Sequence, residues 1–291
     1  MARARAEHPG QAAERAVSRA ANKGQPWTDR AARVGFLARG SVYVLVGGVA
    51  LTAALGAGGA PTDPSGALMR LGRMPAGRAA LALIALGLLV HAAFRAVLAV
   101  IGEPYVKQRR WQRLATRARH GFSALFYLGM SSTAALLAAG RSAEAHADKD
   151  AQTRGLSAWL LGAPFGRPLL VAIAAGIAVA AAVELVRAFG PNRARDHLRV
   201  EAMREGQCKL MVALGRVAYV ARATVLAACA YFLVRGAINR SPRETRGPAG
   251  ALRAVWELPH GGLWLALIAA GLLAFGAYSV LEARWRRVFA R

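Results

Sequence analysis

The sequence has few acidic residues and almost no cysteine. It holds 39 Lys and Arg against 15 Asp and Glu, a formal net charge of +24. Its two cysteines, Cys208 and Cys229, form no Cys-x-x-Cys pair, which argues against zinc or redox chemistry. A Walker loop, a His-Glu-x-x-His pair and a Gly-x-Ser-x-Gly turn are also missing. We therefore expect no enzyme, no cofactor and no metal site.

Long stretches of the chain contain no charged residue, and 55% of all its residues are hydrophobic. A transmembrane helix needs about 20 mainly apolar residues. Three runs contain no charged residue, and three others contain one each, namely Arg95, Glu184 or Arg222. The six candidate spans are 40–62, 79–102, 120–140, 168–186, 217–234 and 258–281. The sequence thus predicts an all-α membrane protein with six transmembrane helices.

These spans come as three copies of one hairpin. Related phrases open the first helix of each copy at residues 33–39, 119–125 and 216–222. A second pattern recurs with unchanged spacing: Gly66, Pro75, Gly77 and Gly87; Gly155, Pro164, Gly166 and Gly176; Gly250, Pro259, Gly261 and Gly271. We interpret the segment before each proline as a short interfacial helix, which the proline ends. The glycine after the proline permits a sharp turn into the membrane, and the last glycine allows close helix packing.

The repeat sets the expected domain organisation. All three hairpins have the same orientation, because each contains two spans, so we expect a pseudo-threefold bundle about an axis normal to the membrane. The predicted segments are a basic, disordered cytoplasmic tail over 1–30, repeats over 31–102, 117–188 and 210–285, and a basic cytoplasmic tail over 286–291.

The repeat phrases resemble a known family. The openings of the Arg-x-Gly-Phe-x-Ala-Arg type and the phrase Pro-Phe-Gly-Arg at 164–167, echoed by Pro-Ala-Gly-Arg at 75–78, are similar to those of the domain of unknown function 1206 family of bacterial membrane proteins. The third copy departs from the phrase, with Pro-His-Gly-Gly at 259–262. The resemblance implies six helices in three two-helix repeats, and it carries no assigned activity.

The distribution of Lys and Arg predicts the orientation in the membrane. The termini and the segments between hairpins carry about twice as many of them as the loops within hairpins, which places both termini in the cytoplasm by the positive-inside rule. We expect a multi-pass protein of the bacterial inner (plasma) membrane that meets anionic lipid headgroups and other membrane proteins, and does not bind nucleic acid. Its oligomeric state stays open. Glu144, Asp148 and Asp150 lie in an outer loop, where we expect them to be solvated.

Ionisable residues inside spans are candidate functional positions. They are Arg39, His91, Arg95, Glu184 and Arg222. Because Glu184 occupies the repeat position of Arg95, we expect it to pair with Arg39, Arg95 or Arg222 of a neighbouring unit. A haem site at His91 is disfavoured, since His120 and His260 lie at span ends on different sides.

Two functions remain open at this stage. The absence of recognisable chemistry favours a structural or accessory membrane protein. The charged residues within spans leave a small-solute or ion translocator with an axial pathway as the alternative. A membrane enzyme has little support.

Overall fold

The computed structural model describes residues 25–102, 110–141, 149–190 and 203–285, and all regular structure in these ranges is helical. The tails predicted over 1–30 and 286–291 lie largely or wholly outside them. Each repeat contains two long helices joined by a short one. They are α2 (Gln25–Ala54), α3 (Pro64–Gly72) and α4 (Gly77–Ile101); α5 (Arg110–Ala138), α7 (Lys149–Leu161) and α8 (Gly166–Phe189); and α9 (Glu205–Ile238), η2 (Pro242–Glu244), α10 (Pro248–Trp256) and α11 (Gly261–Trp285).

The long helices are the predicted spans. Six helical segments are long and apolar enough to cross a membrane, and they indicate a multi-pass membrane protein: Ala32–Ala54, Gly77–Ile101, Gln112–Ala138, Gly166–Phe189, Glu205–Ile238 and Gly261–Trp285. Helix α5 begins at Arg110 and α9 at Glu205, so both extend beyond the apolar runs at their N-terminal ends.

The turn between short and long helix needs glycine for a reason that differs from our expectation. The residue before that glycine takes the left-handed conformation in two repeats, with φ of 59° at Ala76 and 58° at His260. The glycine itself supplies room. A Cβ on Gly77, Gly166 or Gly261 would lie 1.9, 1.4 or 2.0 Å from a carbonyl oxygen of the preceding short helix. Any side chain there would push the two helices apart.

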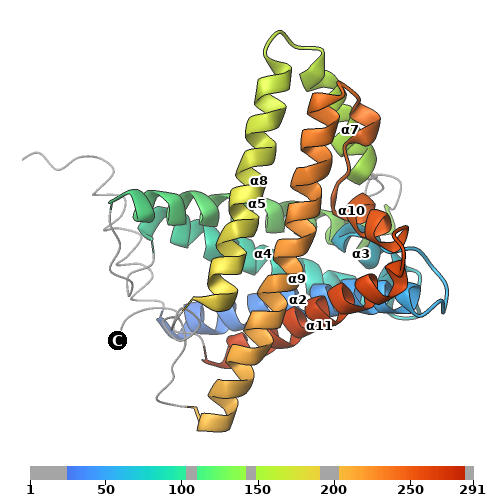
Figure 1. Cartoon of the computed structure of the whole chain (residues 1–291). Coiled ribbons are helices and arrows are strands. Elements are labelled where there is room, and N and C mark those ends of the chain that lie inside the picture. The colour runs from blue at the N-terminus through green and yellow to red at the C-terminus, as the bar shows by residue number, and fades with distance from the viewer. Residues whose placement is uncertain (1–24, 103–109, 142–148, 191–202, 286–291) are drawn as a thin grey trace, which may run out of the picture.

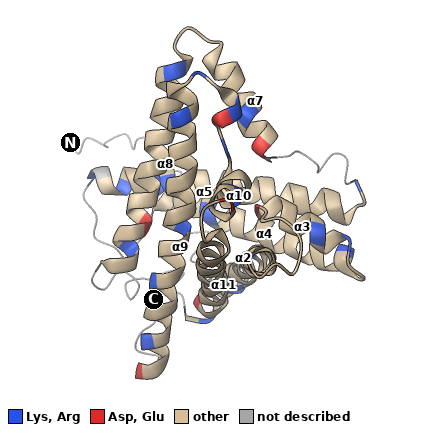
Figure 2. Cartoon of the chain, turned by 45° about the vertical axis from the view of Figure 1, so that its right-hand side comes forward, with Lys and Arg blue, Asp and Glu red and all other residues tan. Residues whose placement is uncertain are grey.

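Neighbouring repeats are joined by helices that pack lengthwise. The pairs are α4 with α5, α8 with α9, and α11 with α2. Figure 1 shows α8 and α9 running upright together, across the direction of the other long helices. In Figure 2, α2 and α11 are seen nearly end-on, whereas α8 and α9 remain upright. The most extensive contacts therefore lie between repeats rather than within them.

Within a repeat, the two long helices pack less extensively. Helix α2 contacts α4 in the first repeat, and α9 contacts α11 in the third. In the second repeat, α5 and α8 do not pack along each other. Five of the six contacts of a closed ring are thus present among the described residues, and the pseudo-threefold bundle stays a prediction.

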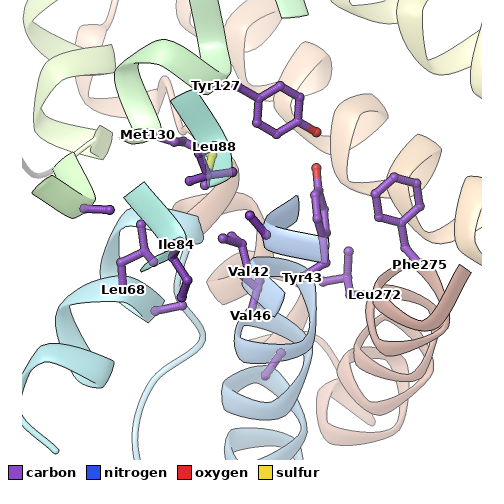
Figure 3. Packing of buried hydrophobic residues seen from close by; sticks show 14 of the residues in the cluster. Val42, Tyr43, Val46, Leu68, Ile84, Leu88, Tyr127, Met130, Leu272 and Phe275 are labelled. Atoms are coloured by element: carbon purple, nitrogen blue, oxygen red, sulfur yellow. The ribbon is translucent and has the colours of Figure 1, made fainter. Parts of the chain in front are cut away.

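The largest apolar core lies where α2, α4, α5 and α11 meet. Figure 3 shows Val42 and Val46 of α2 among Ile84 and Leu88 of α4 and Leu272 of α11. Short helix α3 contributes Leu68, which is fully buried. Burial of this kind stabilises by about 25 cal/mol per Å² of apolar surface removed from water, and by packing where lipid is the solvent.

Candidate functional site

The buried charges of the long helices lie at the lengthwise contacts between repeats. At the α2–α11 contact, Arg39 Nη2 lies 2.5 Å from Glu282 Oε2. Arg39 Nε also donates to Ser279 Oγ, at 3.2 Å. Arg39 and Glu282 are 4% and 3% exposed. A charge buried to this extent is tolerated because an opposite charge and a hydrogen bond accompany it.

The α8–α9 contact carries a looser version of this pair. Arg222 Nη1 lies 3.5 Å from Glu184 Oε1, and Arg187 Nη1 lies 3.8 Å from Glu184 Oε2. Arg222 stands at the repeat position of Arg39, since each closes the opening phrase of its hairpin. Both distances exceed that of a good charge-assisted hydrogen bond, so Glu184 is held mainly by charge.

The α4–α5 contact has arginine and histidine instead. Arg95 Nε lies 3.3 Å from His91 Nε2, and Arg95 Nη1 lies 3.1 Å from His120 Nδ1. Both histidines are fully buried. The first-helix position that holds Arg39 in α2 is Leu125 in α5. The arginine therefore comes from the second helix here, from the position that Glu184 holds in the next repeat.

Aromatic rings surround the two central arginines. The guanidinium carbon of Arg39 lies 5.0 Å from the ring centroid of Phe275, and that of Arg222 lies 4.6 Å from the same centroid. The Tyr43 ring lies 4.5 Å from Phe275, edge to face. Figure 3 shows the hydroxyl groups of Tyr43 and Tyr127 pointing toward each other. The region around Phe275, where α2, α9 and α11 meet, is thus packed with aromatic rings and guanidinium groups as well as with aliphatic side chains.

Contacts join some of the five predicted positions to one another, and one of them to a residue outside the set. The structure brings His91 to Arg95 and Glu184 to Arg222, while Arg39 pairs with Glu282, which the sequence analysis did not select. A signal for Glu282 existed, because it stands one helical turn after Ser279, the repeat position of Glu184.

Two other expectations about polar residues were wrong. His120, expected at a span end, is fully buried beside Arg95. Asp150, expected to be solvated, is also buried, and its Oδ1 accepts from Gly247 N at 2.8 Å. Gly247 is the N-cap of α10, whereas the corresponding helix α3 is capped by its own Asp63, which accepts from Gly66 N at 2.9 Å. The second repeat thus caps a helix of the third. Glu144 and Asp148 lie outside the described residues.

Nothing in the described ranges groups three His, Cys, Asp or Glu side chains around a metal-sized site.

Ion pairs between α2 and α11 and between α8 and α9 hold neighbouring repeats in register, because each pairs a first helix with a second helix of the adjacent repeat. Removing one member of a fully buried pair would leave an uncompensated charge, at a cost of about 3–5 kcal/mol.

Comparison with known proteins agrees with this architecture. The family model described as Domain of Unknown Function (DUF1206) matches three segments, residues 34–102, 118–190 and 217–286. The "Uncharacterized protein YxxB" of Bacillus subtilis (strain 168) is 31% identical over 269 residues, which cover 92% of this chain and 95% of that protein. No solved structure matches. The resemblance seen in the repeat phrases is confirmed, and the chain belongs to the DUF1206 family.

Proposed function

We propose that this chain is a structural or accessory protein of the bacterial plasma membrane and not an enzyme. Both termini are cytoplasmic in this proposal, and the three hairpins form a pseudo-threefold bundle. Its partners are anionic lipid headgroups and other membrane proteins, and nucleic acid is not among them, because the Lys and Arg that make the chain basic are concentrated between the apolar spans.

The observation that carries the proposal is that the buried charges form ion pairs between helices of neighbouring repeats. Arg39 pairs with Glu282, and Arg222 pairs with Glu184. Each pair joins two repeats, and the ring of Phe275 lies against the guanidinium groups of both Arg39 and Arg222. A charge engaged in this way stabilises the assembly of helices, whereas a charge that served permeation would face a water-filled path.

Translocation of a small solute or ion is the second candidate, and one feature favours it. Glu184 Oε2 is buried and accepts no hydrogen bond within the described residues, although Arg187 lies 3.8 Å away. A carboxylate held only by charge can exchange partners more readily than one that is also hydrogen-bonded, as a proton or cation site requires.

Two measurements on the purified full chain separate the candidates. The first is uptake or conductance in liposomes for protons, alkali cations and small neutral solutes. The second is thermal stability of Glu184→Gln and Glu282→Gln. A structural role predicts no flux and a lower melting temperature for both variants. Flux in the wild type that Glu184→Gln abolishes, with unchanged stability, would overturn the proposal in favour of translocation.

A further inference from the structure

The second hairpin has the residues of a helix-packing contact that the other two hairpins make, but its own helices do not make that contact. In the first repeat, a Cβ on Gly87 of α4 would lie 2.4 Å from Ala38 Cβ of α2. In the third repeat, a Cβ on Gly271 of α11 would lie 2.2 Å from Ala221 Cβ of α9. Both glycines are therefore required by close approach of the two long helices of one hairpin.

The second repeat has both residues of this contact but not the contact. Gly176 and Ala124 stand at the corresponding positions of α8 and α5. A Cβ on Gly176 would meet no described atom within 4 Å, and Gly176 is exposed whereas Gly87 and Gly271 are buried.

Aromatic residues close to this glycine–alanine contact show the same difference between repeats. Phe36 of α2 packs against His91 and Phe94 of α4, with ring centroids 5.0 and 5.9 Å apart. Tyr219 of α9 packs against the equivalent positions, Phe275 and Tyr278 of α11, at 6.3 and 5.8 Å.

Their counterpart in α5, Phe122, is exposed. Phe122 is 75% exposed, whereas Phe36 is 1% exposed. The residues of α8 that would receive it are Ala180 and Val183, and both are exposed as well.

The packing of the short helices differs between repeats in the same way as that of the long helices. Helix α3 packs against α2, the first long helix of its own repeat, and α10 packs against α9. Helix α7 instead packs against α8, η2 and α10, and does not pack along α5. The second repeat is therefore open as a unit, with α5 on one side and α7 and α8 on the other.

We infer that the Gly176 face of α8 is a docking site for the Ala124 face of α5 of the same chain, and that their association closes the ring of six helices. The occupant follows from the repeat, because the equivalent face of α4 receives α2 and that of α11 receives α9. A partner within the chain is favoured by its high effective concentration. Ala124 and Gly176 are 52 residues apart, close to the 49 and 50 residues of the other two pairs.

Closure rests on the proposed pseudo-threefold bundle but not on the structural role. It turns the α8–α9 pair, which lies across α4 and α5 in Figure 1, until α8 contacts α5. Phe122 then packs on Ala180 and Val183 as Phe36 packs on its two partners. The chain would thus have an open and a closed arrangement of the same six helices.

The first test places a larger side chain at Gly176, in the proposed contact between α5 and α8. Gly176→Leu is compared with Gly87→Leu, and Val179→Leu on the exposed part of α8 serves as control. Closure predicts that Gly176→Leu lowers the apparent melting temperature in lipid nanodiscs by about 5 °C, as Gly87→Leu does, because the larger side chain forces the helices apart. An unchanged melting temperature for Gly176→Leu, as for Val179→Leu, would mean that this face contacts only lipid and would overturn the inference.

The second test is the formation of a disulfide between α5 and α8. Its readout does not depend on a loss of stability. A disulfide requires a Cβ separation of about 3.8 Å. Gly121 and Ala180 correspond to Gly35 and His91, between which a Cβ on the glycine would lie 2.9 Å from the histidine Cβ. Gly121→Cys and Ala180→Cys are therefore combined in a background with Cys208→Ser and Cys229→Ala, in native membranes.

The control pair is Gly40→Cys with Ser279→Cys between α2 and α11, where a Cβ on Gly40 would lie 3.4 Å from Ser279 Cβ. Closure predicts that both pairs form a disulfide within one chain on mild oxidation, seen as a mobility shift of the monomer that reductant reverses. A disulfide-linked dimer, formed by the Gly121–Ala180 pair but not by either single cysteine, would assign the site to a second copy and overturn the intrachain inference. Formation of the control disulfide alone would overturn closure itself, and neither result bears on the flux measurements.

Discussion

The α2–α11 and α8–α9 contacts use the same arginine position but different carboxylates. Arg39 meets Glu282 at 2.5 Å, with both side chains about 5% exposed. Arg222 meets Glu184 at 3.5 Å, with the arginine side chain 26% exposed. Glu184 corresponds to Ser279, so the two carboxylates differ by nearly one turn along the second helix. A long, flexible arginine can reach either turn, so the repeat preserves the cation while the position of the anion varies.

The tighter pair gives the largest expected effect. Glu282→Gln keeps the shape of the side chain but leaves Arg39 with no formal counter-charge in this pair, so we expect a loss of about 3–5 kcal/mol in unfolding free energy. Thermal or denaturant unfolding in a defined detergent measures it. Glu205→Gln on the surface of α9 is the matched control, because its partner Lys209 is largely exposed. A loss no greater than that of the control would contradict the assigned role of Glu282.

The looser pair is expected to lose less. Glu184→Gln should cost about 1–2 kcal/mol, because Arg222 is partly exposed and the pair lies between the buried and the surface case. A double-mutant cycle with Arg222→Gln isolates the coupling, which should be favourable and smaller than that between Arg39 and Glu282. Equal coupling energies would remove the distinction between the two contacts.

Loss of a helix cap is expected to have a smaller effect, at a different helix in each case. Asp150→Ala removes the side chain that caps α10 from another repeat, and Asp63→Ala removes the cap of α3 from within its own. Each should cost about 1 kcal/mol. Hydrogen exchange should then rise at the N-terminus of α10 for Asp150→Ala and at that of α3 for Asp63→Ala. Exchange that rises elsewhere would show that the carboxylates act on other groups.

A surface ion pair gives the smallest effect. Arg246 and Glu257 lie 3.6 Å apart beside the two ends of α10, with side chains 37% and 64% exposed. Glu257→Gln should change stability by about 0.5 kcal/mol or less and lose even this at high salt. A salt-independent loss above 1 kcal/mol would indicate that this pair, too, is part of the framework.

Much of the architecture could be read from the sequence because it depends on local composition. The apolar runs correspond to the long helices, and the recurring Gly-x-x-x-x-x-x-x-x-Pro-x-Gly spacing marks each turn into a span. Arg39, His91, Arg95, Glu184 and Arg222 were selected because a charge or imidazole within an apolar run, or directly beside it, is costly wherever that run packs.

Partners were harder to predict, because a contact between helices depends on faces and register rather than on composition. Glu282 directly follows the last residue of the apolar run 258–281, so composition alone gives no reason to select it. His120 looked like a span end because α5 begins well before its apolar stretch. Asp150 lies in a polar segment, and its burial reflects tertiary contacts, since its carboxylate accepts from Gly247 N at the start of α10, about a hundred residues later.

The sequence alone determined the number of spans, their threefold repetition and the short helix within each hairpin, since hydrophobic length, proline and glycine act on the chain next to them. Only the tertiary structure decided that the repeats pack lengthwise against each other, that Arg39 pairs with Glu282, and that α5 and α8 of the second hairpin lie apart. Those outcomes depend on which helix faces meet, and three hairpins with nearly the same sequence pattern allow more than one way for them to do so.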